Sequence, residues 1–140
     1  MPDAVLVSDE TIAAMQDILL ASTAAGRELA GVCATRAPTS AEQEGAALQA
    51  GDPWVLEDFR TTRVGEASQV HVAIPGPGEL AWHTHPGLRF SMAGFSDGDA
   101  LALRTTQRPL LVIGYTFVAP ETLSWFAVVA GWQGIALTAA

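Results

Sequence analysis

Several residue types are scarce in this 140-residue chain, and each scarcity excludes a class of protein. The single cysteine, Cys33, rules out an intramolecular disulfide and a zinc site built from several cysteines. Seven Lys and Arg residues stand against fifteen Asp and Glu residues, which gives a formal net charge of −8. Because phosphate-backbone binding needs clustered basic side chains, we expect no nucleic acid partner.

Long apolar runs and a basic N-terminal segment are also missing. No stretch reaches the roughly 18 to 20 apolar residues of a membrane-spanning helix, so we expect no membrane association. Residues Met1–Asp9 lack the basic start and apolar core of a signal peptide. Together with the scarcity of cysteine, these features predict a cytoplasmic protein.

What the chain does contain is typical of a globular domain. Hydrophobic residues make up 49% and charged residues 16% of the sequence, which favours a packed core over disorder. No internal repeat or linker divides the chain, so we predict a single domain over residues 1–140.

The spacing of apolar residues predicts an α+β fold with a mixed β-sheet. Ser8 and two following acids indicate a helix start, Ile12, Met15 and Leu19 form an apolar stripe, and Gly26 indicates its end. A short helix after Ser40, a turn at Pro75–Gly78 and a helix over Ser96–Thr106 are also expected. The predicted strands are Leu29–Thr35, Trp54–Thr61, Val70–Ile74, Leu80–Thr84, Leu110–Phe117, Leu123–Val129 and a last one near Ile135.

The residues that point to chemistry lie in Trp82–Pro86 and Ser96–Asp99. Side chains two apart on a strand point the same way, so His83 and His85 can converge on one ion while Thr84 faces the opposite side. A carboxylate from the following loop would supply a third ligand and leave a fourth position open, as catalytic zinc requires. The same residues are also compatible with a polar strand face and a helix capping box.

This pattern resembles the JAMM motif of the JAB/MPN zinc metalloproteases, in particular the prokaryotic JAB-type members. His83-Thr84-His85-Pro86 followed by Ser96-x-x-Asp99 is similar to that motif, and Glu28-Leu29-Ala30-Gly31 resembles its upstream Glu-x-x-Gly. The order of these elements covers nearly the whole chain. The resemblance implies an MPN/JAB-like domain whose mixed central sheet is flanked by helices in a cytidine-deaminase-like layered architecture.

The resemblance also implies a role for each matching residue. His83, His85 and Asp99 would bind one zinc ion per chain. Glu28 would act as the general base that takes a proton from the attacking water and returns it to the leaving amine. Ser96 would donate a hydrogen bond to the oxyanion that forms during attack.

The spacing between the two parts of the motif departs from the family pattern. The third ligand and the base each have a second candidate residue. Nine residues separate Pro86 from Ser96, a longer stretch than is usual in the family, so Asp97 is an alternative third ligand to Asp99. Glu79, which lies just ahead of His83 and next to the predicted turn, is a rival base to Glu28. His71 is interpreted as a structural residue of an alternating strand, and Cys33 as a buried, inert side chain.

The implied activity is hydrolysis of the amide bond at the C-terminus of a ubiquitin-like protein, either in maturation or in deconjugation. Phe90 and Phe95, in the loop Gly87–Phe95, are the predicted substrate contacts. The alternatives are a non-catalytic MPN-like scaffold and the processing of a sulfur-carrier protein's C-terminus. A cupin would need a later histidine that this chain lacks, and a zinc deaminase would need more cysteines than it has.

Overall fold

The computed structural model describes residues 5–45, 53–66, 70–72, 74–86, 99, 101, 108–119, 122–130 and 135–139. Two helices and seven strands have described bounds, and Asp99 and Leu101 are also helical, so the fold is α+β. The helices are α1 (Asp9–Ala25) and α2 (Ser40–Gly45). The strands are β1 (Val5–Val7), β2 (Leu29–Arg36), β3 (Trp54–Val64), β4 (Glu79–Thr84), β5 (Leu110–Ala119), β6 (Thr122–Ala130) and β7 (Ile135–Ala139).

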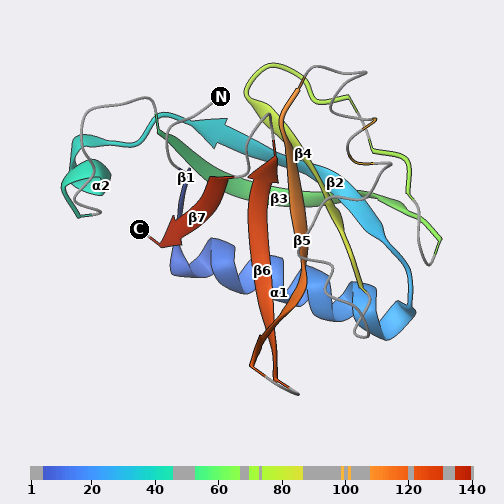
Figure 1. Ribbon diagram of the computed structural model, residues 1–140. Helices are drawn as coiled ribbons and strands as arrows, with labels where there is room; N and C mark the ends of the chain where they lie inside the picture. The colour runs from blue at the N-terminus through green and yellow to red at the C-terminus, as the bar shows by residue number, and fades with distance from the viewer. Residues whose placement is uncertain are drawn as a thin grey trace.

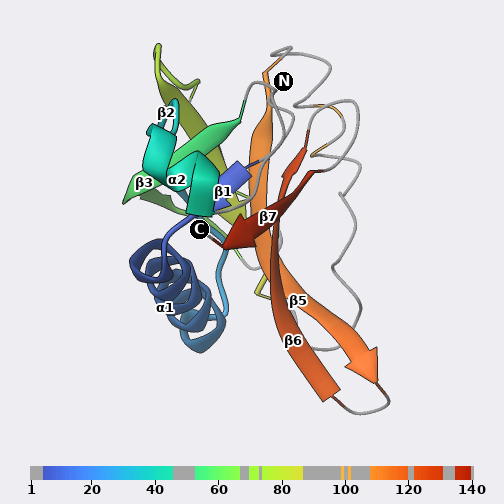
Figure 2. The ribbon, with the colours of Figure 1, turned by 90° about the vertical axis from the view of Figure 1, so that its left-hand side faces the viewer.

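The described strands form one mixed sheet in the order β1-β3-β2-β4-β5-β6-β7. The pairs β1–β3, β1–β7 and β4–β5 are parallel, and the other neighbouring pairs are antiparallel. Because β1 pairs with both β3 and β7, the sheet curls until its two ends meet, as Figure 2 shows. This places β2, β4 and β5 side by side, and these strands carry or border the candidate site.

Helix α1 packs lengthwise against one face of the curled sheet (Figure 1). Its Met15 and Leu19 are fully buried, while Ile12 and Ile18 pack against the same core. The apolar stripe predicted from the sequence is therefore confirmed. The core that this helix covers also contains buried side chains from five strands, namely Val5, Val7, Cys33, Leu56, Leu80, Trp82, Leu111 and Ile113.

The ends of α1 follow the local sequence signals. The side chain of Ser8 accepts a hydrogen bond from the backbone N–H of Thr11 at 3.2 Å and caps the helix. Gly26 ends the helix in the left-handed conformation at φ 65°, which favours glycine. Both predicted boundaries are confirmed. Among the described residues, no helix combines the length and the apolar character that a membrane crossing demands.

Gly31 permits the close approach of three strands. It pairs with Thr61 of β3 and with Trp82 of β4. A Cβ atom on Gly31 would overlap the backbone carbonyl of Arg60 and would lie 2.5 Å from the Trp82 indole. A side chain at this position would therefore force β2 and β3 apart, which explains the glycine in the Glu-x-x-Gly segment.

The structure corrects the sequence-based prediction at two places. The predicted strand Val70–Ile74 is wrong, because its described residues lie outside the sheet and Ile74 is 75% exposed. An alternating pattern does not by itself supply a neighbouring strand. Both edges of β2 are already paired, one with β3 and the other with β4. His71, interpreted as part of that strand, is exposed outside it. The sequence also gave no signal for β1, whose three residues are too few for a detectable period.

Candidate metal centre

The end of strand β4 presents His83, and the residue that follows the strand, His85, on the face opposite to the helix. Leu80 and Trp82 point into the core beneath α1, so the alternating histidines point the other way. Both histidines are buried, with exposed fractions of 2% and 6%. The backbone N–H of His85 donates to the carbonyl of Ile113 at 2.8 Å, which holds the residue after β4 against β5.

The two imidazoles meet through their Nε2 atoms. These atoms lie 3.1 Å apart, and the ring planes are inclined at 66° with centroids 4.9 Å apart. Two ring nitrogens at this distance can form a hydrogen bond only when one carries a proton and the other does not. In their neutral forms, both nitrogens can instead direct a lone pair at one cation between them.

The carboxylate of Asp99 forms, with the imidazoles of His83 and His85, a triangle of three donor groups, called the donor triangle below. Its Oδ1 lies 2.7 Å from Nε2 of His83, and its Oδ2 lies 3.2 Å from Nε2 of His85. With zinc–ligand bonds near 2.0–2.1 Å, the donors of a tetrahedral site are separated by about 3.3 Å. The three residues therefore lie about 0.1 to 0.6 Å closer together than this spacing, and an outward movement, largest between His83 and Asp99, would make room for a zinc-sized ion.

Glu28, the residue directly before β2, reaches the same place. The antiparallel register pairs Ala30 with His83, and continuing it by two residues brings Glu28 opposite His85. One carboxylate oxygen of Glu28 and one nitrogen of each histidine all lie within 4.8 Å of one another, and Glu28 is only 7% exposed. The buried group Glu28, His83 and His85 could thus hold a metal ion.

The two carboxylates stand at different distances from the imidazoles. In the part of the chain that the structure describes, Asp99 forms ion pairs with both histidines, whereas Glu28 forms none with them. This difference favours Asp99 as a direct ligand and leaves Glu28 farther from the donor triangle. Asp97, the alternative ligand, lies outside the described residues.

The surroundings of Glu28 alter its acidity. Burial raises the pKa of the Glu28 carboxyl above its ordinary value, and the negative charge of Asp99 adds to this effect. The imidazoles of His83 and His85 oppose the rise. A buried carboxyl with a raised pKa is a better proton acceptor than a solvated one, which suits a general base.

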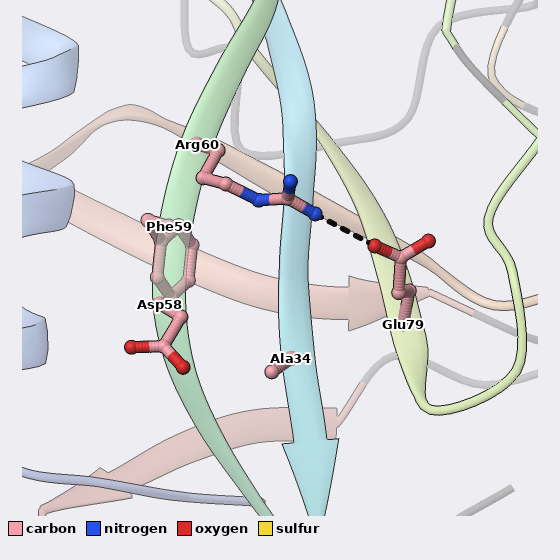
Figure 3. A pocket seen from close by; sticks show the side chains of 5 residues that line it. All are labelled: Ala34, Asp58, Phe59, Arg60 and Glu79. Carbon is pink, nitrogen blue, oxygen red and sulfur yellow. Dashed lines mark hydrogen bonds and ion pairs between the residues drawn. The ribbon is translucent and has the colours of Figure 1, made fainter.

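Glu79, the rival base, lies elsewhere on β4. It is four residues from His83, or about 13 Å along an extended strand. Its carboxylate forms an ion pair with Arg60 at 2.8 Å and accepts a hydrogen bond from the N–H of Gly76 at 2.9 Å. Figure 3 shows Arg60 and Glu79 pointing toward each other at a pocket that Ala34, Asp58 and Phe59 also line. Glu79 therefore lies away from the two histidines.

Three predicted site residues lie outside the described part of the chain: Ser96, Phe90 and Phe95. Two residues that the sequence reasoning left without a role, Ser22 and Thr84, contact the segment that carries Glu28. A signal for Ser22 was present, because it continues the stripe of Met15 and Leu19 at the next three-residue step. A polar residue at a buried helical position needs a hydrogen-bonding partner.

The site thus brings together two imidazoles and two carboxylates from separate segments of the chain. All four residues are buried, and three of them have donor atoms 2.7–3.2 Å apart. Comparison with protein-family models and with curated proteins found no match for this chain.

Proposed function

We propose that the protein is a zinc-dependent peptidase of the JAB/MPN type, which hydrolyses an amide bond through an activated water. The observation that carries this proposal is the convergence of His83, His85 and Asp99, with the buried carboxyl of Glu28 beside them. Two imidazoles and one carboxylate are a ligand set of catalytic zinc sites, in which the fourth position remains open.

In this proposal His83, His85 and Asp99 hold the metal. When bound, zinc would polarise the scissile carbonyl and lower the pKa of the attacking water toward about 7. Iron and other divalent metals also bind two histidines and a carboxylate, so the identity of the ion is part of the proposal.

Glu28 performs the proton transfers. As the water oxygen attacks the carbonyl carbon, Glu28 accepts the proton that the water loses. It then donates this proton to the leaving nitrogen as the carbon–nitrogen bond breaks, so that a carboxylate and an amine are formed. The raised pKa of Glu28 supports both roles, since the group must accept and then release a proton near neutral pH.

The proposed substrate is the C-terminal tail of a ubiquitin-like protein or its conjugate. This part of the proposal depends on the resemblance of His83–Pro86, Ser96–Asp99 and Glu28–Gly31 to the JAMM motif. Ser96 as the oxyanion donor, and Phe90 and Phe95 as tail contacts, belong to the same proposal.

The test combines metal content with hydrolysis of a fluorogenic amide attached to the C-terminus of a ubiquitin-like protein. We expect about one zinc per chain in the wild type and in Glu28→Gln, and none in His85→Ala. Glu28→Gln should lower kcat by about 10²- to 10⁴-fold, because it removes the general base. Glu79→Gln is the matched control, and it should retain turnover.

Two results would contradict the proposal. The first is a wild-type protein that takes up no zinc after the metal is added at neutral pH. The second is a zinc-loaded protein whose turnover is the same in the wild type and in Glu28→Gln. Zinc uptake without hydrolysis of any ubiquitin-like probe would favour the non-catalytic scaffold.

A further inference from the structure

Two buried hydroxyl groups lie between helix α1 and the metal-binding strand. Ser22 of α1 and Thr84 of β4 are both completely buried, and their side-chain oxygens are 2.6 Å apart. Thr84 stands between His83 and His85 in sequence, and its side chain points to the opposite face of β4. The pair therefore lies directly behind the candidate metal centre.

These hydroxyls form a chain of hydrogen bonds whose direction is determined. Ser22 donates its proton to the carbonyl oxygen of Arg27 at 2.5 Å, since a carbonyl can only accept. Thr84 must then donate to Ser22, and it accepts in turn from the backbone N–H of Leu29 at 2.9 Å. This series of hydrogen bonds begins at the N–H of Leu29 and ends at the carbonyl of Arg27, the two residues that flank Glu28.

The backbone of Glu28 itself is held from the other side. Its N–H donates to the carbonyl of Glu66 at 2.8 Å, and its carbonyl accepts from the N–H of Gly65 at 2.7 Å. The N–H of Arg27 also donates to the carbonyl of Ser22 at 3.2 Å. Residues 27–29 are thus held by hydrogen bonds from the segment 65–66 on one side and from Ser22 and Thr84 on the other.

We propose that Ser22 and Thr84 are positioning residues that hold Glu28 in register with the two histidines. The inference rests on the proposed function, in which Glu28 is the general base. Thr84 ends β4 between His83 and His85, so any movement of this segment moves its hydroxyl together with the imidazoles. Through the bond to Leu29, the base-bearing segment follows that movement.

A measurement of Glu28 itself tests this inference without a substrate. The probe is zinc alone, added to protein in which glutamate side-chain carboxyls are labelled with ¹³C. We expect zinc to shift the Glu28 carboxyl resonance in the wild type and in Thr84→Ser, which retains the hydroxyl. Thr84→Val has nearly the same shape but lacks the hydroxyl, so it should bind zinc through intact ligands while the Glu28 shift is strongly reduced. An equal shift in Thr84→Val would overturn the inference.

A second variant covers the case in which Thr84→Val does not fold. Ser22→Ala retains the bond from Leu29 to Thr84, and it removes both the bond from Thr84 to Ser22 and the bond from Ser22 to Arg27. It should therefore reduce the zinc-dependent shift of Glu28 less than Thr84→Val would. An unchanged shift in folded Ser22→Ala would then overturn the inference.

Turnover of the fluorogenic amide separates a positioning role from a general loss of stability. Thr84→Val should lower kcat by up to about 10²-fold, the effect of misplacing a catalytic group by about 1 Å. The double variant Thr84→Val/Glu28→Gln should be no slower than Glu28→Gln alone, because Thr84 acts through Glu28. Additive losses would contradict this.

The two proposals fail in different ways. If zinc shifts Glu28 in a Thr84-dependent manner but the wild type hydrolyses no amide, the proposed function is wrong and the positioning role stands. If the wild type hydrolyses the amide but Thr84→Val leaves the Glu28 shift unchanged, the positioning role is wrong and the proposed function stands.

Discussion

Zinc should stabilise the folded protein, and the size of this effect should identify the ligands. A ligand that binds only the folded state at 100 times its dissociation constant stabilises it by about 2.7 kcal/mol. For a chain of this length, that corresponds to a rise in Tm of roughly 5–11 °C. The donor atoms of His83, His85 and Asp99 are already gathered within 2.7–3.2 Å of one another, so the chain need not fold further to assemble the ligands.

Removing one donor should nearly abolish the rise. Even residues that only orient a metal ligand are worth about 10- to 100-fold in affinity, so His85→Ala should lose at least about 100-fold. At the same zinc concentration the stabilisation then falls to about 0.4 kcal/mol or less, or about 1 °C in Tm. Asp99→Asn should behave similarly, whereas Glu28→Gln should retain most of the rise.

The assay is thermal unfolding of metal-free protein with and without added zinc, followed by circular dichroism. His71→Ala is the matched control, because His71 is exposed and lies outside the site. Its zinc-dependent rise should equal that of the wild type. If His85→Ala shows the full rise, zinc binds elsewhere and the reasoning from the donor triangle is refuted.

Three further predictions concern the fold and its pH dependence. Gly31→Ala should lower the free energy of unfolding by about 1–3 kcal/mol or more in urea titrations, because the methyl group would overlap a β3 carbonyl. Gly45→Ala, which meets open space, should be nearly neutral. Burial raises the pKa of the Cys33 thiol to about 12, with a smaller contribution from a nearby carboxylate. An unfolded thiol ionises near about 8.5, so above that pH the stability of the wild type should fall relative to Cys33→Ala by up to about 1.4 kcal/mol per pH unit. Hydrogen bonds from Arg36 hold the pKa of the Glu42 carboxyl at about 2. This lowered pKa stabilises the fold above the ordinary pKa of glutamate, and the contribution is lost as the pH falls through about 2. Glu42→Gln should therefore be destabilising at pH 6, and its difference from the wild type should be much smaller at pH 2. Equal stability of these two proteins at both pH values would contradict it.

Local signals in the sequence predicted the elements that carry the site. The cap at Ser8, the glycine at Gly26 and the apolar stripe between them defined α1, because these effects act within a few residues. The two-residue period of an extended chain likewise predicted that His83 and His85 share one face and that Thr84 lies on the other. Such predictions succeed because backbone geometry alone determines which side chains share a face.

The sequence could not determine which strands become neighbours. Val70–Ile74 alternates as a strand should, yet it has no place beside β2, whose two edges are taken by β3 and β4. β1 is too short to produce a pattern, yet it joins the ends of the sheet. Pairing depends on contacts between distant segments, which no local period records.

The sequence by itself determined the chemistry that is available: two histidines two residues apart, a following carboxylate, an upstream Glu28, and no set of cysteines to replace them. The tertiary structure decided which carboxylates meet the imidazoles. It carried Glu28, just before β2, and Asp99, from a later segment, to the same buried place, and it paired Glu79 with Arg60 elsewhere. The physical reason is the antiparallel register of β2 against β4, which brings Glu28 opposite His85 across 57 residues of chain.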